Sequence, residues 1–213
     1  MKKNLLTLMI SAILSFGILI AQSASAITLG FQPEVQNTAL GDSVTVDLII
    51  SDLGDYMPDS LSTFDITILF DSMILSVDTA DIDNDGVIDS VSLDPSSQLD
   101  IYGFGLNVLS ASVTSPGTLN IYDLSFDTED DLNNYQKGNF SLATITFDTI
   151  GVGTSELLID SATIQLGDAT GNPLVATLNS GFVTVAASVP EPATCLFMGV
   201  GLVGLLGLKK KKF

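Results

Sequence analysis

The stretch FDITILF, Phe64 to Phe70, decides the fold. Phenylalanine or isoleucine stands at every second position, and aspartate, threonine and leucine stand between them. Because successive side chains of a β-strand point to opposite faces, this alternation predicts a strand with one buried face. SVTVDLIIS, Ser43 to Ser51, alternates in the same way. We expect both apolar stripes to face one core: Phe64, Ile66, Ile68 and Phe70 from one strand, and Val44, Val46, Leu48 and Ile50 from the other.

Four further segments show the same habit and are expected to be strands: 118–126, 140–149, 155–166 and 181–187. Turn signals such as Asp85-Gly86 and Pro116-Gly117 separate the segments. One helical turn is expected near 130–135. Short alternating strands punctuated by turns predict an all-β fold, an antiparallel β-sandwich.

The N-terminus has the layout of a secretory signal peptide over residues 1–26. Lys2 and Lys3 precede an apolar run from Leu5 to Ile20, and the small residues Ala24 and Ala26 mark a cleavage site. The mature chain is therefore expected to begin at Ile27. The alternative is an uncleaved N-terminal membrane anchor.

The C-terminus, 189–213, reads VPEPATCLFMGVGLVGLLGLKKKKF. Residues 193–208 carry no charge and form a predicted transmembrane helix. Such a helix would cover about 24 Å, less than the roughly 30 Å of a bilayer core. The basic tail, 209–213, would stay in the cytoplasm under the positive-inside rule. A short span of this kind suits a removable signal, the alternative being a plain C-terminal anchor.

This tail resembles the PEP-CTERM sorting signal of Gram-negative bacteria. Val189, Pro190, Glu191 and Pro192 match its motif, and the helix and the lysines follow in the expected order. The resemblance implies recognition by an exosortase-type processing enzyme and a membrane anchorage that lasts only until processing. It also implies a place in the cell envelope or extracellular matrix, associated with exopolysaccharide.

The segment between the two signals, 27–188, is long enough for one domain with a real core. Of the 25 acidic residues only Glu191 lies outside it, which leaves 24 against a single basic residue, Lys137. Such a surface cannot neutralise phosphates, so nucleic-acid binding is excluded. The only cysteine, Cys195, lies in the tail, so the domain has neither a disulfide nor a thiolate metal site.

The domain is similar to cohesins in its final Gly-Phe-Val-Thr-Val strand, which begins at Gly181, and in three longer stretches. These are LGFQPEVQNTALGDSVTVDLIISDLGD (29–55), LSTFDITILFDSMILSV (61–77) and GNFSLATITFDTIGVGTSELLI (138–159). Cohesins are jelly-roll β-sandwiches that bind dockerin modules or act as scaffold modules. The resemblance implies that fold for 27–188 and a dockerin-type protein as one partner.

One motif in the domain points to a metal. DIDNDGVID places Asp81, Asp83, Asp85 and Asp89 at the spacing of an EF-hand-type loop, and Val87 could offer its carbonyl. The expected cofactor is Ca²⁺. Position 12 is Ser92 in place of the usual glutamate, and Asp78 or Asp94 could substitute for it. The alternative is a solvated acidic turn.

The chain has no histidine, which excludes Ser-His-Asp and Cys-His catalysis. No carboxylate pair is singled out for glycoside hydrolysis. We therefore expect an exported, non-catalytic surface or matrix protein. The alternative is a binding module that recognises a dockerin-type protein or a polysaccharide through one face of the sandwich. Candidate sugar-stacking residues are Tyr102, Tyr122 and Tyr135.

Overall fold

The computed structural model describes residues 26–188. The sorting motif, the predicted C-terminal helix and all of the predicted signal peptide except Ala26 lie outside these residues. Within residues 26–188, no helix has the length and apolar character needed to cross a membrane.

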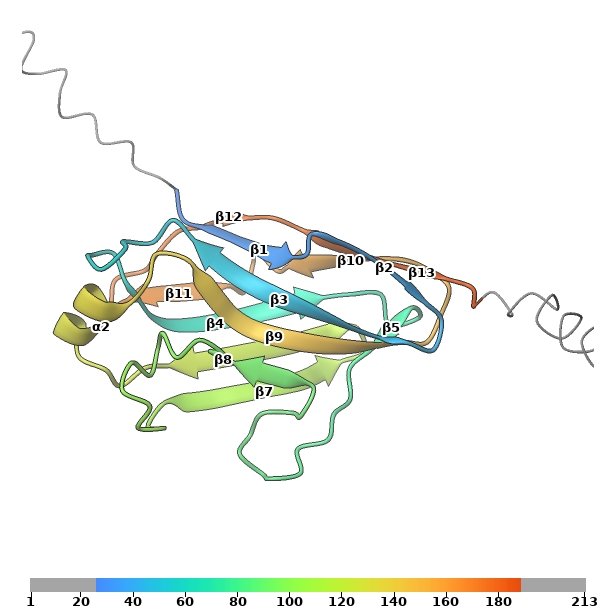
Figure 1. Ribbon diagram of the computed structural model, residues 1–213, viewed down its shortest axis with the longest axis horizontal. Coiled ribbons are helices and arrows are strands. Elements are labelled where there is room, and N and C mark those ends of the chain that lie inside the picture. Colours follow the sequence, from blue (N-terminus) through green and yellow to red (C-terminus); the bar gives the residue numbers. More distant parts are fainter. Residues whose placement is uncertain (1–25, 189–213) are drawn as a thin grey trace, which may run out of the picture.

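Two β-sheets pack face to face (Figure 1). The first sheet has the order β12-β1-β3-β9-β5, and β6 also pairs with β9. Its strands are β1 (Thr28–Gln32), β3 (Ser43–Ser51), β5 (Leu75–Ser76), β6 (Val91–Leu93), β9 (Phe140–Thr149) and β12 (Thr177–Leu178). The second sheet has the order β2-β13-β10-β4-β8-β7, and β11 also pairs with β4. Its strands are β2 (Val35–Ala39), β4 (Leu61–Leu69), β7 (Val108–Ser115), β8 (Thr118–Leu124), β10 (Gly153–Ile159), β11 (Gln165–Asp168) and β13 (Gly181–Ala186).

The predicted all-β sandwich is confirmed, and most strand pairs are antiparallel. Two pairs run parallel, β1 with β12 and β2 with β13. The chain enters the first sheet as β1 and crosses to the second as β2, so its N-terminal segment borders both layers. The sandwich is therefore not purely antiparallel, in contrast to the prediction from the sequence, because each sheet has one parallel pair at an edge.

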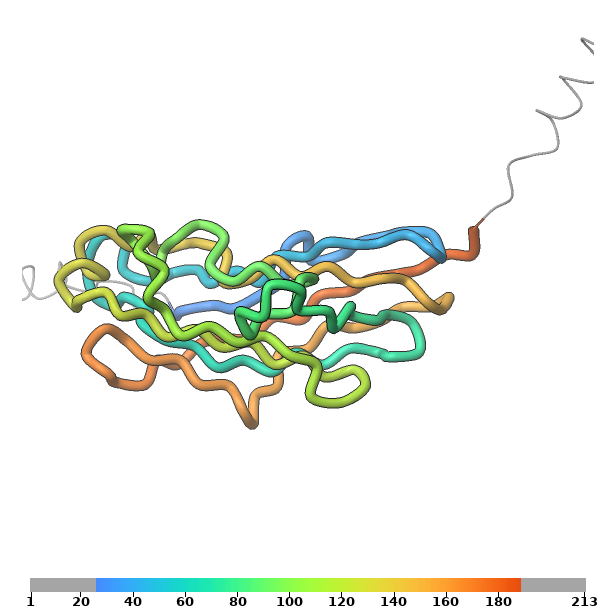
Figure 2. Tube along the Cα trace, turned by 90° about the horizontal axis from the view of Figure 1, so that it is seen from below, coloured from blue at the N-terminus to red at the C-terminus, as the bar shows by residue number. Residues whose placement is uncertain are grey.

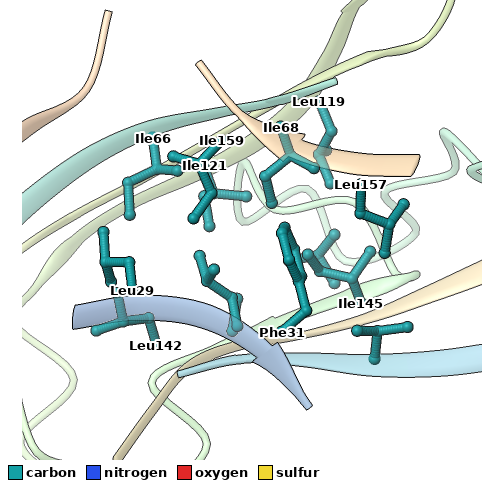
Figure 3. Packing of buried hydrophobic residues seen from close by; sticks show 14 of the residues in the cluster. Leu29, Phe31, Ile66, Ile68, Leu119, Ile121, Leu142, Ile145, Leu157 and Ile159 are labelled. Atoms are coloured by element: carbon teal, nitrogen blue, oxygen red, sulfur yellow. The ribbon is translucent and has the colours of Figure 1, made fainter. Parts of the chain in front are cut away.

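The core lies between the sheets, where the alternating residues of both meet (Figure 3). Ile66 and Ile121 come from the second sheet and Ile145 from the first, and all three are fully buried. Every predicted core residue of the two opening stretches is buried except Phe70, which is partly buried and packs edge-on against Phe147 at 5.3 Å. Among the residues that the structure describes, this core extends from Ile27 to Val185.

The predicted strand at 155–166 is two strands, β10 and β11, that both pair with β4. Asp160 causes the break because its carboxylate accepts hydrogen bonds from the Ala162 backbone N–H at 3.0 Å and from the Thr163 hydroxyl at 3.1 Å. Such local side-chain bonds compete with the strand ladder and form a turn. The chain then rejoins β4 further along.

Helix α2 (Glu129–Tyr135) is the expected helical turn. Thr128 caps it by accepting a hydrogen bond from the Asp131 N–H, and three acidic residues in the first turn complement the positive end of the helix dipole. Figures 1 and 2 place α2 and the loop around residue 100 at one end of the elongated sandwich. The chain leaves β13 toward residue 188 at the opposite end.

Candidate functional site

The acidic loop brings three of its predicted ligands together. Asp81, Asp83 and Asp85 each place a carboxylate oxygen within 4.8 Å of the others. The backbone helps to gather them, because Asp81 accepts hydrogen bonds from the N–H groups of Asp85 and Gly86, both at 3.2 Å. Gly86 has φ +90°, a left-handed conformation that glycine adopts without strain.

The loop is docked on the edge strand β7. Ile88 donates its N–H to the carbonyl of Ala111 at 3.2 Å, and Ala111 donates to Gly86 at 3.0 Å. The side chains of Val87 and Ile88 are buried. The apolar half of the motif therefore holds the acidic half at a fixed place on the surface.

The remaining predicted ligands are less well placed. Asp89 does not belong to the converging group, although one of its oxygens lies 3.4 Å from the Ile82 N–H. Asp94 is also outside the converging group, and its carboxylate accepts hydrogen bonds from the backbone of Gln98 and Leu99. Asp78 is likewise outside the group of three and bonds the N–H of Ala80.

A second candidate site lies at the α2 end of the sandwich. Four of the five aromatic side chains that are exposed in residues 26–188 gather here, and we call this surface the end patch: Tyr102, Phe104, Phe126 and Tyr135. Phe104 and Phe126 are 69% and 60% exposed. Exposed aromatic rings gathered in one place are typical of a binding surface, because covering their apolar area with a ligand is energetically favourable.

The rings of the end patch are arranged around Tyr102. Its ring centroid lies 5.7 Å from that of Phe104 and 6.4 Å from that of Tyr135. The Tyr102 hydroxyl donates a hydrogen bond to Asp131 at 2.8 Å. Hydrogen bonds from the Thr128 and Tyr102 hydroxyls hold the pKa of Asp131 below its usual value, so this carboxylate stays charged at the rim.

A hollow of about 200 Å³ opens between these rings. Asp100, Asp127 and Asp131 line it together with Tyr102, Phe104 and Phe126. The charged side chains in the hollow are all acidic. It therefore offers aromatic surface with carboxylates at its border, and it would repel an anionic ligand.

Gln136 joins the loops that carry the end patch. Its fully buried side-chain amide donates hydrogen bonds to the carbonyls of Leu61 and Gln98, at 2.8 and 2.9 Å, and accepts one from the Leu61 N–H at 2.7 Å. Its backbone carbonyl accepts from the N–H of Tyr56. One residue thus ties the end of α2 to β4, to the loop before Tyr102 and to the loop after β3.

Of the tyrosines predicted for sugar stacking, Tyr102 and Tyr135 come together. Tyr122 lies on β8 and alternates with the buried Ile121 and Asp123, so it faces the outer side of the sheet. Phe104 and Phe126 were not predicted. Phe104 stands in a stretch without alternation, and Phe126 is the last residue of the predicted strand 118–126, two residues beyond the end of β8.

Comparison with known proteins agrees with both resemblances. Residues 188–212 match the model of the PEP-CTERM protein-sorting motif. No curated protein matches the chain. The match confirms the predicted sorting signal at Val189 to Pro192 and implies that the protein is exported and sorted to the cell envelope.

Solved structures with a similar fold include several cohesins. The sixth cohesin of Acetivibrio cellulolyticus scaffoldin B, in complex with a Cel5 dockerin, is 21% identical with a TM-score of 0.53, over 76% of this chain and 100% of that one. A Clostridium thermocellum OlpA cohesin, from a type I cohesin-dockerin complex, is 15% identical with a TM-score of 0.56, over 76% and 100%. A non-cellulosomal cohesin of Archaeoglobus fulgidus is 12% identical with a TM-score of 0.53, over 81% and 98%.

The chain is therefore a cohesin-like β-sandwich followed by a PEP-CTERM sorting motif. At these identities the structural likeness establishes the fold alone. The fold fits a binding module, and the motif implies export.

Proposed function

We propose that this protein is a non-catalytic surface or matrix protein that associates with exopolysaccharide through the end patch. The observation that carries the proposal is the gathering of exposed rings around Tyr102. The apolar faces of sugar rings pack well on aromatic side chains, and the bordering carboxylates can accept hydrogen bonds from hydroxyl or ammonium groups. An uncharged or amine-bearing polysaccharide fits this surface, since an acidic one would be repelled.

The position of the end patch supports this role. The chain leaves the sandwich toward the sorting motif at the end opposite α2 (Figure 1). A domain tethered through that terminus would present the end patch away from its attachment. We propose that an exosortase-type enzyme of a Gram-negative envelope processes the tail, and that the membrane holds the protein only before this step.

Removing two rings of the end patch tests the proposed ligand. The double substitution Tyr102→Ala and Phe104→Ala is expected to weaken binding of the 27–188 domain to the host's purified exopolysaccharide by at least about tenfold, or roughly 1.4 kcal/mol. Affinity electrophoresis in gels that contain the polysaccharide would measure it. Met73→Ala is the control, because Met73 is 79% exposed and shortly precedes β5, a strand that lies away from the α2 end (Figure 1).

Unchanged mobility of the double variant, with Met73→Ala behaving identically, would remove the end patch as the polysaccharide site. A second candidate function would then come forward, the recognition of a dockerin-type protein through a sheet face. The cohesin-like fold favours it, because two of the similar cohesins were solved in complex with a dockerin. Binding of a purified dockerin module from the same host, unaffected by the end-patch substitutions, would support this candidate.

For the acidic loop we propose a Ca²⁺ site in which Asp81, Asp83 and Asp85 are ligands. The support is the convergence of three carboxylates, which are hard oxygen ligands of the type that Ca²⁺ prefers. Asp89 and the Val87 carbonyl belong to the same motif and would complete the set after a small local adjustment. The bound ion would fasten the loop to β7.

Calcium is expected to raise the melting temperature of the domain. With a Kd near the weak extracellular range of about 1 mM, 10 mM Ca²⁺ adds roughly 1.4 kcal/mol and about 3–5 °C. Differential scanning calorimetry would measure this shift as the difference between wild type and the double variant Asp83→Asn, Asp85→Asn, whose own shift with Ca²⁺ should be smaller by that amount. If Ca²⁺ raised the melting temperatures of the variant and of wild type equally, the acidic loop would not be a Ca²⁺ site.

A further inference from the structure

Asp123 is a buried carboxylate on the inner side of the second sheet. It follows Leu119 and Ile121 in the alternation of β8, at a position where the pattern calls for an apolar side chain. It is 0% exposed. One carboxylate oxygen accepts a hydrogen bond from the Asn107 amide at 3.0 Å, and the other has no partner. A buried oxygen of this kind is costly unless something binds it.

Asp123 lines a cavity of about 140 Å³ between β8 and the segment from Leu93 to Leu109. Four further polar residues line the same cavity: Asp94, Ser97, Asp100 and Asn107. Their side chains offer oxygen atoms that can act as ligands of a cation. The only lysine of the domain, Lys137, is not among the lining residues. Three carboxylates thus share one small space without a basic group to offset them.

The two loop carboxylates are built firmly into this cavity. Asp94 accepts hydrogen bonds from the N–H groups of Gln98 and Leu99, at 2.8 and 2.7 Å. Asp100 accepts from Phe104 and Gly105, at 2.9 and 2.8 Å. Backbone N–H donors stabilise the charged form of a carboxylate. The cavity is therefore preformed by the backbone, and the carboxylates of Asp94 and Asp100 line it together with Asp123.

We propose that this cavity binds a hard divalent cation, Ca²⁺, with Asp123 as the inner ligand and Asp94 and Asp100 at the rim. A cation would give the unpartnered oxygen a ligand bond and offset the repulsion among the three carboxylates. The volume admits an ion with a few waters, each of which occupies about 30 Å³. Ca²⁺ fits better than Mg²⁺, because it tolerates irregular oxygen sets and Mg²⁺ demands a near-ideal octahedron.

This site is separate from the acidic loop and has a different consequence. Asp100 lines both this cavity and the hollow of the end patch. An ion held by Asp123 and Asp100 fastens the segment that carries Tyr102 and Phe104 onto β8. Calcium thereby orders the aromatic surface from beneath.

Calorimetric titration of CaCl₂ into metal-stripped 27–188 domain tests the site. The acidic loop is first silenced by Asp83→Asn and Asp85→Asn, so any remaining binding belongs elsewhere. This background is expected to bind one Ca²⁺ with a Kd between about 10⁻⁵ and 10⁻³ M. Adding Asp123→Asn, which keeps the shape of the side chain, should weaken that binding at least tenfold. MgCl₂ should bind more weakly than CaCl₂.

Two results would overturn the proposal. One is a background variant that gives neither heat nor a thermal shift with 10 mM Ca²⁺. The other is binding that persists unchanged after Asp123→Asn. Circular dichroism establishes that the variant is folded, and Asp100→Asn, which alters the rim without touching the buried group, is the second variant and should weaken binding as well.

Discussion

Replacing Gln136 with leucine is expected to lower the free energy of unfolding by about 3–5 kcal/mol. The substitution leaves the N–H and carbonyl of Leu61 and the carbonyl of Gln98 buried without their partners. Each unsatisfied group costs about 1–3 kcal/mol. Urea unfolding followed by circular dichroism would measure the loss, which corresponds to roughly 10 °C or more in melting temperature.

Gln165→Leu is the matched control, because Gln165 lies exposed on β11. It should change stability by less than about 0.5 kcal/mol. If the two variants were equally stable, Gln136 would not be the residue that joins the loops at the α2 end. The end patch would then need another source of order.

Asp123→Asn is expected to stabilise the metal-free domain at pH 8 by up to about 4 kcal/mol and to have little effect near pH 4. Burial, then repulsion from Asp94 and Asp100, raises the pKa of Asp123 from 3.8 to about 7, while the Asn107 amide opposes the rise. A shift of that size corresponds to about 4 kcal/mol. The folded protein holds this proton more tightly than the unfolded chain does. The stabilising effect of this bound proton is therefore complete below pH 3.8 and is lost as the pH rises through about 7.

Urea midpoints in EDTA, taken from pH 4 to pH 8, would measure this effect as the difference between wild type and Asp123→Asn. The difference isolates one group among the 24 carboxylates of the domain, whose general repulsion also varies with pH. Asp42→Asn is the control, because Asp42 is exposed. A wild-type midpoint that stays parallel to that of Asp123→Asn across the range would contradict a buried proton at this position.

The core could be predicted from the sequence because it follows alternation alone. The strand at Ser43–Ser51 and the one at Phe140–Thr149 have the predicted bounds. Strand β7, Val108–Ser115, was not predicted, because serine and threonine take most of its alternate positions and only Ala111 is buried. It forms because β8 offers a complete ladder of backbone partners, which the local sequence does not reveal.

The candidate sites also differ in whether the local sequence is enough to predict them. The acidic loop is a local motif, so the spacing of its aspartates is enough to predict it. The binding of Ca²⁺ there stays a prediction. The end patch is tertiary, because Tyr102, Phe126 and Tyr135 come from separate segments. Gln136 joins the end of α2 to the loop before Tyr102, and Asp127, next to Phe126, accepts a hydrogen bond from the Ile101 N–H. Asp123 occupies an apolar position in a regular strand pattern. Only the burial of its side chain and its unpartnered oxygen distinguish it from the other aspartates.

The most direct test of the account is the intact mass of the protein recovered from the envelope and medium of its own host. We predict a chain that begins at Ile27 and ends between Pro190 and Ala193, with or without an added group. That mass would show that the tail is a processing signal and that the sandwich is delivered outside the cell. A mass that extends to Phe213 would contradict this, because the tail would then be a lasting membrane anchor.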